Sequence, residues 1–220
     1  MEKNKFVCKN CGYCCRNFGK SKTLPLFEFE IPKIEEKAKN LQKTVVFIPE
    51  NILIDKKSGT LFCMNYGMAV MPCPFLEKSG DNKQTCSIYP DRPLICRKFP
   101  LEKNPLFHKL KKSNFFDCDY FDSDEILKSI KKGNRCSNNE QTKKQFTEIF
   151  GKEIWEASLT VDKIKDKLNK NLSRLEELKK IEIASGEWID TKGKEIIGVF
   201  EFLKKIKDKH NIKIHKGDLS

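Results

Sequence analysis

The sequence lacks long apolar runs, is poor in histidine and has no glycine-rich nucleotide loop. No stretch approaches about 18 uncharged apolar residues, which excludes a transmembrane helix. The opening residues, Met-Glu-Lys-Asn-Lys-Phe-Val-Cys, lack the apolar region of a signal peptide, so we expect a cytoplasmic protein. Three histidines leave little general-base capacity. No Gly-x-Gly occurs, so no Rossmann-type adenosylmethionine loop is visible.

Cysteine is abundant in the first part of the chain. All ten cysteines lie within the first 136 of 220 residues. In a reducing cytosol, clustered cysteines are more often metal ligands or catalytic thiols than disulfides, although intracellular proteins of hyperthermophiles keep disulfides. The asymmetry predicts a cysteine-rich domain over residues 1–120 and a second region over 121–220.

The fold expected is α+β, with a small, irregular, metal-stabilised domain followed by a helical C-terminal region. We predict a helix over 31–40, with Pro32 near its first turn. The β-rich runs 44–48 and 51–55, the turn 57–59 and the run 60–64 predict a hairpin. Pro93 suits the start of a short helix that continues through Cys96 to about Phe99.

Three helices are predicted after residue 136. Ser137 and Glu140 have capping-box spacing and open a helix to about Leu159. A second helix carries apolar residues at spacings of three and four from Val161 to Leu178, and Ser185-Gly186 stops it. The third amphipathic run is 194–209. These apolar stripes are more typical of packing faces than of a coiled coil, and they also offer a surface for a protein partner.

The most informative motif is Cys8-x-x-Cys11-x-x-Cys14-Cys15. Two-residue gaps let thiolates converge on one ion, as in zinc knuckles and rubredoxin-like sites. The same gaps open the bacterial ferredoxin pattern, but its fourth cysteine is missing. Neighbouring side chains diverge in most backbone conformations, so Cys14 and Cys15 suit two nearby centres or one bridged cluster.

A second cysteine segment begins at Met71-Pro-Cys73-Pro-Phe-Leu and continues as Cys86-Ser-Ile-Tyr-Pro-Asp-Arg-Pro-Leu-Ile-Cys96-Arg-Lys-Phe-Pro. The prolines beside Cys73 stiffen the backbone, as a fixed ligand loop requires. Only five arginines occur among 43 basic residues, and Arg16, Arg92 and Arg97 lie in or beside the cysteine motifs. Their planar multi-donor cations would suit carboxylates or a negatively charged thiolate–metal site.

These linked motifs, over roughly residues 6–120, resemble the CxxCxxCC cysteine-cluster family. That family is described as a zinc- or iron-chelating domain and includes flagellin lysine N-methylase-type proteins. The resemblance implies metal ligation by seven cysteines: Cys8, Cys11, Cys14, Cys15, Cys73, Cys86 and Cys96. It leaves open whether the group is zinc, iron or an iron–sulfur cluster.

The remaining candidates have weaker signals. Cys118 is either an eighth ligand or a packing thiol, whereas Cys63 and Cys136 are read as packing thiols. His108 could complete a coordination sphere, but a surface or packing role is the simpler interpretation. A thioredoxin-type pair at Cys11 and Cys14 is disfavoured because no βαβ framework surrounds it.

The leading hypothesis is therefore a cytoplasmic protein that binds a metal ion or cluster, with its reaction unassigned. The alternative is an enzyme, either an iron–sulfur-dependent protein lysine N-methylase-like protein or a redox catalyst. A third hypothesis is a nucleic-acid-binding zinc protein, which the net charge of +12 allows. No aromatic-plus-basic RNA-binding run accompanies that charge, and part of it would balance thiolates, so we expect no nucleic-acid partner.

Overall fold

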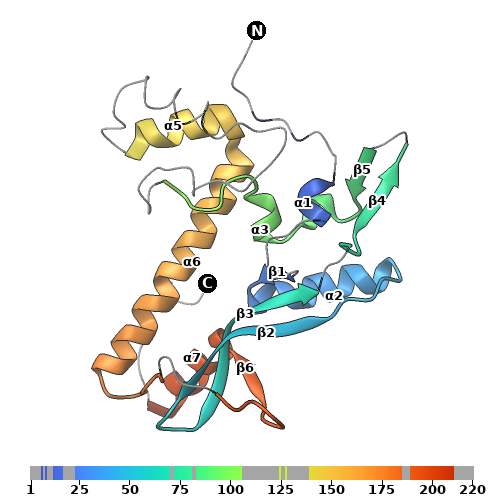
Figure 1. Ribbon diagram of the computed structural model, residues 1–220. Coiled ribbons are helices and arrows are strands. Elements are labelled where there is room, and N and C mark those ends of the chain that lie inside the picture. The colour runs from blue at the N-terminus through green and yellow to red at the C-terminus, as the bar shows by residue number, and fades with distance from the viewer. Residues whose placement is uncertain are drawn as a thin grey trace. The chain divides into compact units, whose positions relative to one another are not determined.

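The computed structural model describes residues 6, 8, 12–16, 23–69, 72–80, 83–105, 124, 127, 139–184 and 189–210. Helices and strands are mixed, which confirms the predicted α+β class and the helical C-terminal region (Figure 1). No helix within these ranges is apolar over enough of its length to cross a bilayer.

The chain forms two compact units that alternate along the sequence. The cysteine unit consists of Met1–Ser21 and Val70–Ile164, and the sheet unit consists of Lys22–Ala69 and Lys165–Ser220. Nine of the ten cysteines fall in the cysteine unit, and Cys63 falls in the sheet unit. The predicted boundary at residue 120 lies outside the described residues and stays a prediction.

The sheet unit is built on a long hairpin. β2 (Phe47–Asp55) pairs antiparallel with β3 (Thr60–Ala69), from Phe47 opposite Met68 to Asp55 opposite Thr60. This confirms the predicted hairpin, but the runs 44–48 and 51–55 contribute to one strand, which begins at Phe47. β1 (Thr23–Leu26) pairs antiparallel and β6 (Ile196–Gly198) parallel with β3.

A single carboxylate organises the hairpin turn. Asp55 is buried and accepts hydrogen bonds from the Ser58 hydroxyl at 2.6 Å and from the backbone N–H of Lys57 at 3.2 Å. It also accepts the N–H of Glu182 at 2.8 Å. Gly59 completes the turn with φ +70°, a conformation that costs glycine nothing.

Two helices supply the core of the sheet unit. α2 (Ile31–Asn40) has the predicted bounds and buries Ile34 and Ala38. α7 (Val199–His210) stacks Phe202 on Phe62 of β3, with ring centroids 4.1 Å apart. Glu28, in the short helix η1 (Glu28–Glu30), accepts the N–H of Phe200 at 3.1 Å and so satisfies a free donor at the start of α7.

The cysteine unit combines short elements with two helices. It contains α1 (Tyr13–Arg16), the hairpin of β4 (Leu76–Ser79) and β5 (Lys83–Cys86), η2 (Tyr89–Asp91) and α3 (Leu94–Arg97). α5 (Asn139–Phe150) and the first part of α6 (Lys152–Glu177) complete it. Its core is apolar and mostly aromatic: Leu101, Leu127, Phe146, Phe150 and Trp155.

The predicted helix boundaries need three corrections. The helix expected to reach Leu159 ends at Phe150, because Gly151 has φ +86° and interrupts it. The next helix starts at Lys152 and ends at Glu177, before the expected stop at Ser185-Gly186. The run 194–209 begins as strand β6 and becomes helical only at Val199.

Most residues of the predicted apolar stripes are buried within the chain, whereas Leu178 is 49% exposed and lies beyond the end of α6. The buried ones are Val161, Leu168, Leu172, Leu175, Val199, Leu203 and Ile206. This confirms that they are packing faces. The predicted capping residue Ser137 lies outside the described residues.

Candidate metal centre

The seven predicted ligands all belong to the cysteine unit. Cys8 is exposed, and Cys15, Cys73, Cys86 and Cys96 are half-buried. Cys14 lies in α1 but its side chain is not described, and Cys11 lies outside the described residues, as do His108, Cys118 and Cys136. Within the described part of the chain, no three Cys, His, Asp or Glu side chains are grouped closely enough to hold a metal.

The first cysteine segment turns at Gly12. The Gly12 carbonyl accepts the backbone N–H groups of Cys15 and Arg16, both at 3.1 Å, and this turn forms α1. Gly12 itself has φ +70°, in the left-handed region that costs other residues about 1–2 kcal/mol. Glycine between Cys11 and Cys14 is therefore required by the backbone.

The second segment brings Cys73 and Cys86 to the same end of a hairpin. The Cys73 carbonyl accepts the N–H of Leu76 at 3.0 Å, which closes a tight turn immediately before β4. Leu76 is then the residue directly opposite Cys86 in β5. The two ends of a β-turn lie within about 7 Å of each other, and residues paired across a hairpin within about 5.5 Å. Cys73 and Cys86 are therefore close in space, although they are thirteen residues apart in the sequence.

Cys96 is presented by the short helix that Pro93 was predicted to start. The Pro93 carbonyl accepts the N–H of Cys96 at 2.9 Å and that of Arg97 at 3.0 Å, which confirms the helix. Lys98, two residues after Cys96, is 2% exposed, and its ammonium donates to the Glu102 carbonyl. A buried cation thus lies two residues from a predicted ligand in the sequence.

Two contacts join the two cysteine segments, although they are far apart in the sequence. A Cβ atom added to Gly12 would lie only 2.9 Å from the carboxamide carbon of Gln84, which is two residues before Cys86. The ring of Phe6, two residues before Cys8, meets that of Phe99, three residues after Cys96, at 6.4 Å. Figure 1 shows α1 and α3 near one end of the β4–β5 hairpin.

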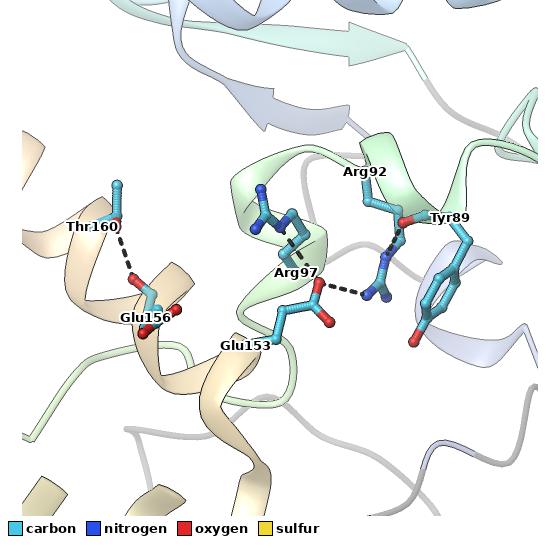
Figure 2. Close-up of polar contacts among 6 residues, drawn as sticks. All are labelled: Tyr89, Arg92, Arg97, Glu153, Glu156 and Thr160. Carbon is cyan, nitrogen blue, oxygen red and sulfur yellow. Dashed lines mark hydrogen bonds and ion pairs between the residues drawn. The ribbon is translucent and has the colours of Figure 1, made fainter. Parts of the chain in front are cut away.

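Arg92 and Arg97 share one carboxylate at the start of α6 (Figure 2). Glu153 Oε1 lies 3.3 Å from Arg92 Nη2 and 3.4 Å from Arg97 Nε. Arg92 also donates from Nε to the Tyr89 carbonyl at 3.0 Å and lies 3.7 Å from the centre of the Tyr89 ring. Two cations therefore share one carboxylate; Arg97 directly follows Cys96 in the sequence, and Arg92 comes four residues before it.

A buried polar network holds the end of the second segment on α6. Asn104 is fully buried; its backbone N–H donates to Asp162 at 2.6 Å and its side-chain amide to Ser158 at 2.8 Å. Because buried polar groups are costly unless they are paired, these bonds fix the segment that follows α3 on one face of the helix.

The residues present fit a thiolate-bound metal. The absence of a Cβ at Gly12 lets the Gln84 amide lie against the turn, and Gln84 Oε1 is buried there without a hydrogen-bond partner in the described chain. Thiolates are the ligands of structural zinc and of iron–sulfur clusters. The position of Cys63 is different: it is buried in β3 of the sheet unit, as expected of a packing thiol.

Comparison with known families decides the family of the chain. The model of the CxxCxxCC family, described as a zinc- or iron-chelating domain, matches residues 7–145, more than half of the sequence. The chain belongs to the CxxCxxCC family. A search of the curated proteins and a search of the solved structures each gave no match.

Membership in the CxxCxxCC family agrees with the resemblance found in the cysteine motifs. The matched span includes all seven predicted ligands and also Glu153's two arginine partners, but it ends before α6. Sequence reasoning missed Phe6, Gln84 and Glu153. Nothing in the spacing of Gln84 or Glu153 points to the cysteine motifs, because only the fold brings them there.

Proposed function

We propose that this protein chelates zinc, iron or an iron–sulfur cluster in the cytoplasm, through Cys8, Cys11, Cys14, Cys15, Cys73, Cys86 and Cys96. The observation that carries the proposal is the pair of contacts between the cysteine segments, Gly12 with Gln84 and Phe6 with Phe99. They bring together segments about 70–90 residues apart, as a site with ligands from both requires.

Electrostatics supports the same assignment. Thiolates are the metal-binding form of cysteine, and several of them together repel one another unless a cation is present. A dication with four thiolates still has a net charge of about −2. Arg92, Arg97 and the buried Lys98 supply positive charge near Cys96, although Glu153 offsets part of it.

The bound group would determine the role. Zinc closed by four thiolates would fix the fold of the cysteine unit, whereas iron with an open position would allow redox or group-transfer chemistry. The methylase-like alternative requires iron with an open position. The positive charge near Cys96 does not distinguish zinc from iron, because both metals are bound by thiolates.

The test is anaerobic purification of the full chain, followed by metal and sulfide analysis and a visible absorption spectrum. We expect stoichiometric zinc or iron that Cys96→Ser lowers. Cys63→Ala is the matched control, since Cys63 lies in the sheet unit, and it should keep the metal content of the wild type. Protein without zinc or iron, or equal metal content in both variants and the wild type, would refute the proposal.

A further inference from the structure

Gln84 is a half-buried residue with a buried amide oxygen, at the contact between the two cysteine segments. It lies in β5, two residues before Cys86, so both side chains are on the same face of the hairpin. Its Oε1 is the atom nearest to the position that a Cβ on Gly12 would occupy, and its carboxamide carbon and its Cβ lie 2.9 Å and 3.2 Å from that position. The amide is therefore held against the turn between Cys11 and Cys14.

The hydrogen bonding of this amide is incomplete within the described chain. Gln84 Oε1 is buried and has no partner there. Leaving a buried acceptor unpaired is unfavourable, and most such groups in proteins have a partner. The two ends of a carboxamide are nearly identical in shape, so the hydrogen-bond partners decide which end faces a given group.

A thiolate ligand is the acceptor that the location offers to the NH₂ end of this amide. Gly12 follows the predicted ligand Cys11 directly, and the predicted ligands Cys14 and Cys15 come two and three residues after it. Metal-bound thiolates keep lone pairs that accept hydrogen bonds, and donors around a metal site orient its ligands and tune the metal. With its NH₂ group turned toward Gly12, the amide would present a donor where its oxygen has no partner.

We propose that Gln84 is a positioning residue that donates an N–H to a metal-bound thiolate of the Cys8–Cys15 segment. This inference rests on the proposed metal site and adds a specific donor to it. The amide would hold the first segment against the hairpin and stabilise the negative charge on sulfur. Replacement of the donor should therefore change both metal affinity and the electronic properties of the thiolate.

The test compares Gln84→Met with Thr85→Met in the full chain. Methionine keeps the length of glutamine and removes its donor, whereas Thr85 lies on the opposite, exposed face of β5. Zn²⁺ affinity is measured by competition with a chromophoric chelator. We expect Gln84→Met to lower it about 10–100-fold, as loss of an outer hydrogen bond does elsewhere, and Thr85→Met to leave it within about 3-fold.

Spectroscopy separates a hydrogen bond from simple packing. In Co²⁺-substituted protein, loss of an N–H donor raises the energy of the sulfur lone pairs, so the thiolate-to-metal charge-transfer bands of Gln84→Met should move to lower energy. For a native iron–sulfur cluster, the equivalent result is a lower reduction potential. Weakened binding with unmoved bands, or with an unmoved potential, would show packing alone and overturn the inference.

A second variant tests the inference in case Gln84→Met does not fold. Gln84→Glu keeps the shape and places an anion near the thiolates, so we expect a larger loss of Zn²⁺ affinity than for Gln84→Met. If Gln84→Glu binds Zn²⁺ as the wild type does, the inference is wrong while the metal site stands. If the wild type itself binds no metal, the proposed function fails and this inference fails with it.

Discussion

Phe6 and Phe99 meet edge to face, with their ring centroids 6.4 Å apart and their planes at 62°. Phe6 also lies 6.3 Å from the ring of Phe150, and its N–H donates to the Ile149 carbonyl at 2.7 Å. The chain just before Cys8 is thus fixed on α5 and on the end of the second cysteine segment. The aromatic core of the cysteine unit positions one group of predicted ligands relative to the other.

Phe6→Ala should weaken this connection. Phe6 is half-buried, so the loss of its packing should lower the free energy of unfolding by about 1–3 kcal/mol, less than for a fully buried phenylalanine. Denaturant unfolding of the metal-bound protein measures the change, and metal affinity should fall as well. Phe29→Ala is the control, because Phe29 is 51% exposed and lies in the sheet unit. Equal metal affinity in Phe6→Ala and the wild type would contradict the role of this contact.

Gly12→Ala should reduce metal affinity more than a comparable glycine substitution. Gly12 and Gly80 have φ +70° and +63°, so alanine costs roughly 1–2 kcal/mol of backbone strain at each. A Cβ at Gly80 meets nothing within 4 Å, whereas one at Gly12 would displace the Gln84 amide. Competition with a chelator measures the metal affinity of the two variants, and the difference between them gives the effect of displacing Gln84 apart from backbone strain. The same affinity in both would show that only backbone strain matters.

Removal of the metal should unfold the cysteine unit. Structural zinc contributes about 10–16 kcal/mol to folding in finger peptides, which is comparable to the net stability of a domain. We expect chelation, Cys11→Ser or Cys96→Ser to abolish much of the circular dichroism signal and the thermal transition of this unit. Cys63→Ala, treated in parallel, should keep the metal-dependent transition. An unchanged spectrum and melting curve in stripped protein would refute the prediction.

Local sequence signals predicted much of the fold. The helix over Ile31–Asn40, the β2–β3 hairpin with its turn at Gly59 and the helical turn after Pro93 all follow from nearby residues. The two cysteine segments were also visible, because ligand spacing is a local property. Gly151 interrupts the helix predicted to reach Leu159, although apolar residues continue at helical spacing on both sides of it.

The features that were not predicted depend on distant residues. Ile196 continues an amphipathic pattern, yet it pairs with Leu61 of β3 and is a strand residue, because tertiary pairing overrides local propensity. Gln84 meets Gly12, and Glu153 meets Arg92 and Arg97, only because the fold brings them together. No spacing rule identifies such partners in one sequence.

Glu153→Gln should have a small effect on stability. Arg92 is 17% and Arg97 40% exposed, but the Glu153 carboxylate that they share is 51% exposed. Because solvent reaches this carboxylate, each ion pair contributes roughly 0.2–1 kcal/mol. A double-mutant cycle of Arg92→Ala with Glu153→Gln should give a coupling energy in this range that decreases at high salt. The cycle of Lys152 with Glu156, an exposed pair four residues apart, is the comparison. A coupling energy above about 2 kcal/mol would show a desolvated pair.

The thiol of Cys63 should make the protein less stable at alkaline pH. Burial raises the pKa of this thiol, and a hydrogen bond with Tyr66 opposes the rise only in part. Above about pH 8.5 the cysteine of the unfolded chain loses its proton while the folded thiol keeps it. The unfolded state then binds fewer protons, so the free energy of unfolding decreases as pH rises from the unfolded pKa toward the folded one. Cys63→Val removes this contribution.

Denaturant unfolding between pH 7.5 and 10, in the wild type and in Cys63→Val, measures the difference. The stability of the wild type should fall more steeply with pH than that of Cys63→Val. The variant also loses the hydrogen bond with Cys63 that, after burial, raises the pKa of Tyr66, so the difference reports the Cys63–Tyr66 pair. Alkylation of Cys63 in the native protein should be slow for the same reason, because the thiolate is the reactive form. Parallel stability profiles for the two proteins would mean that the Cys63 thiol titrates alike in the folded and unfolded chains.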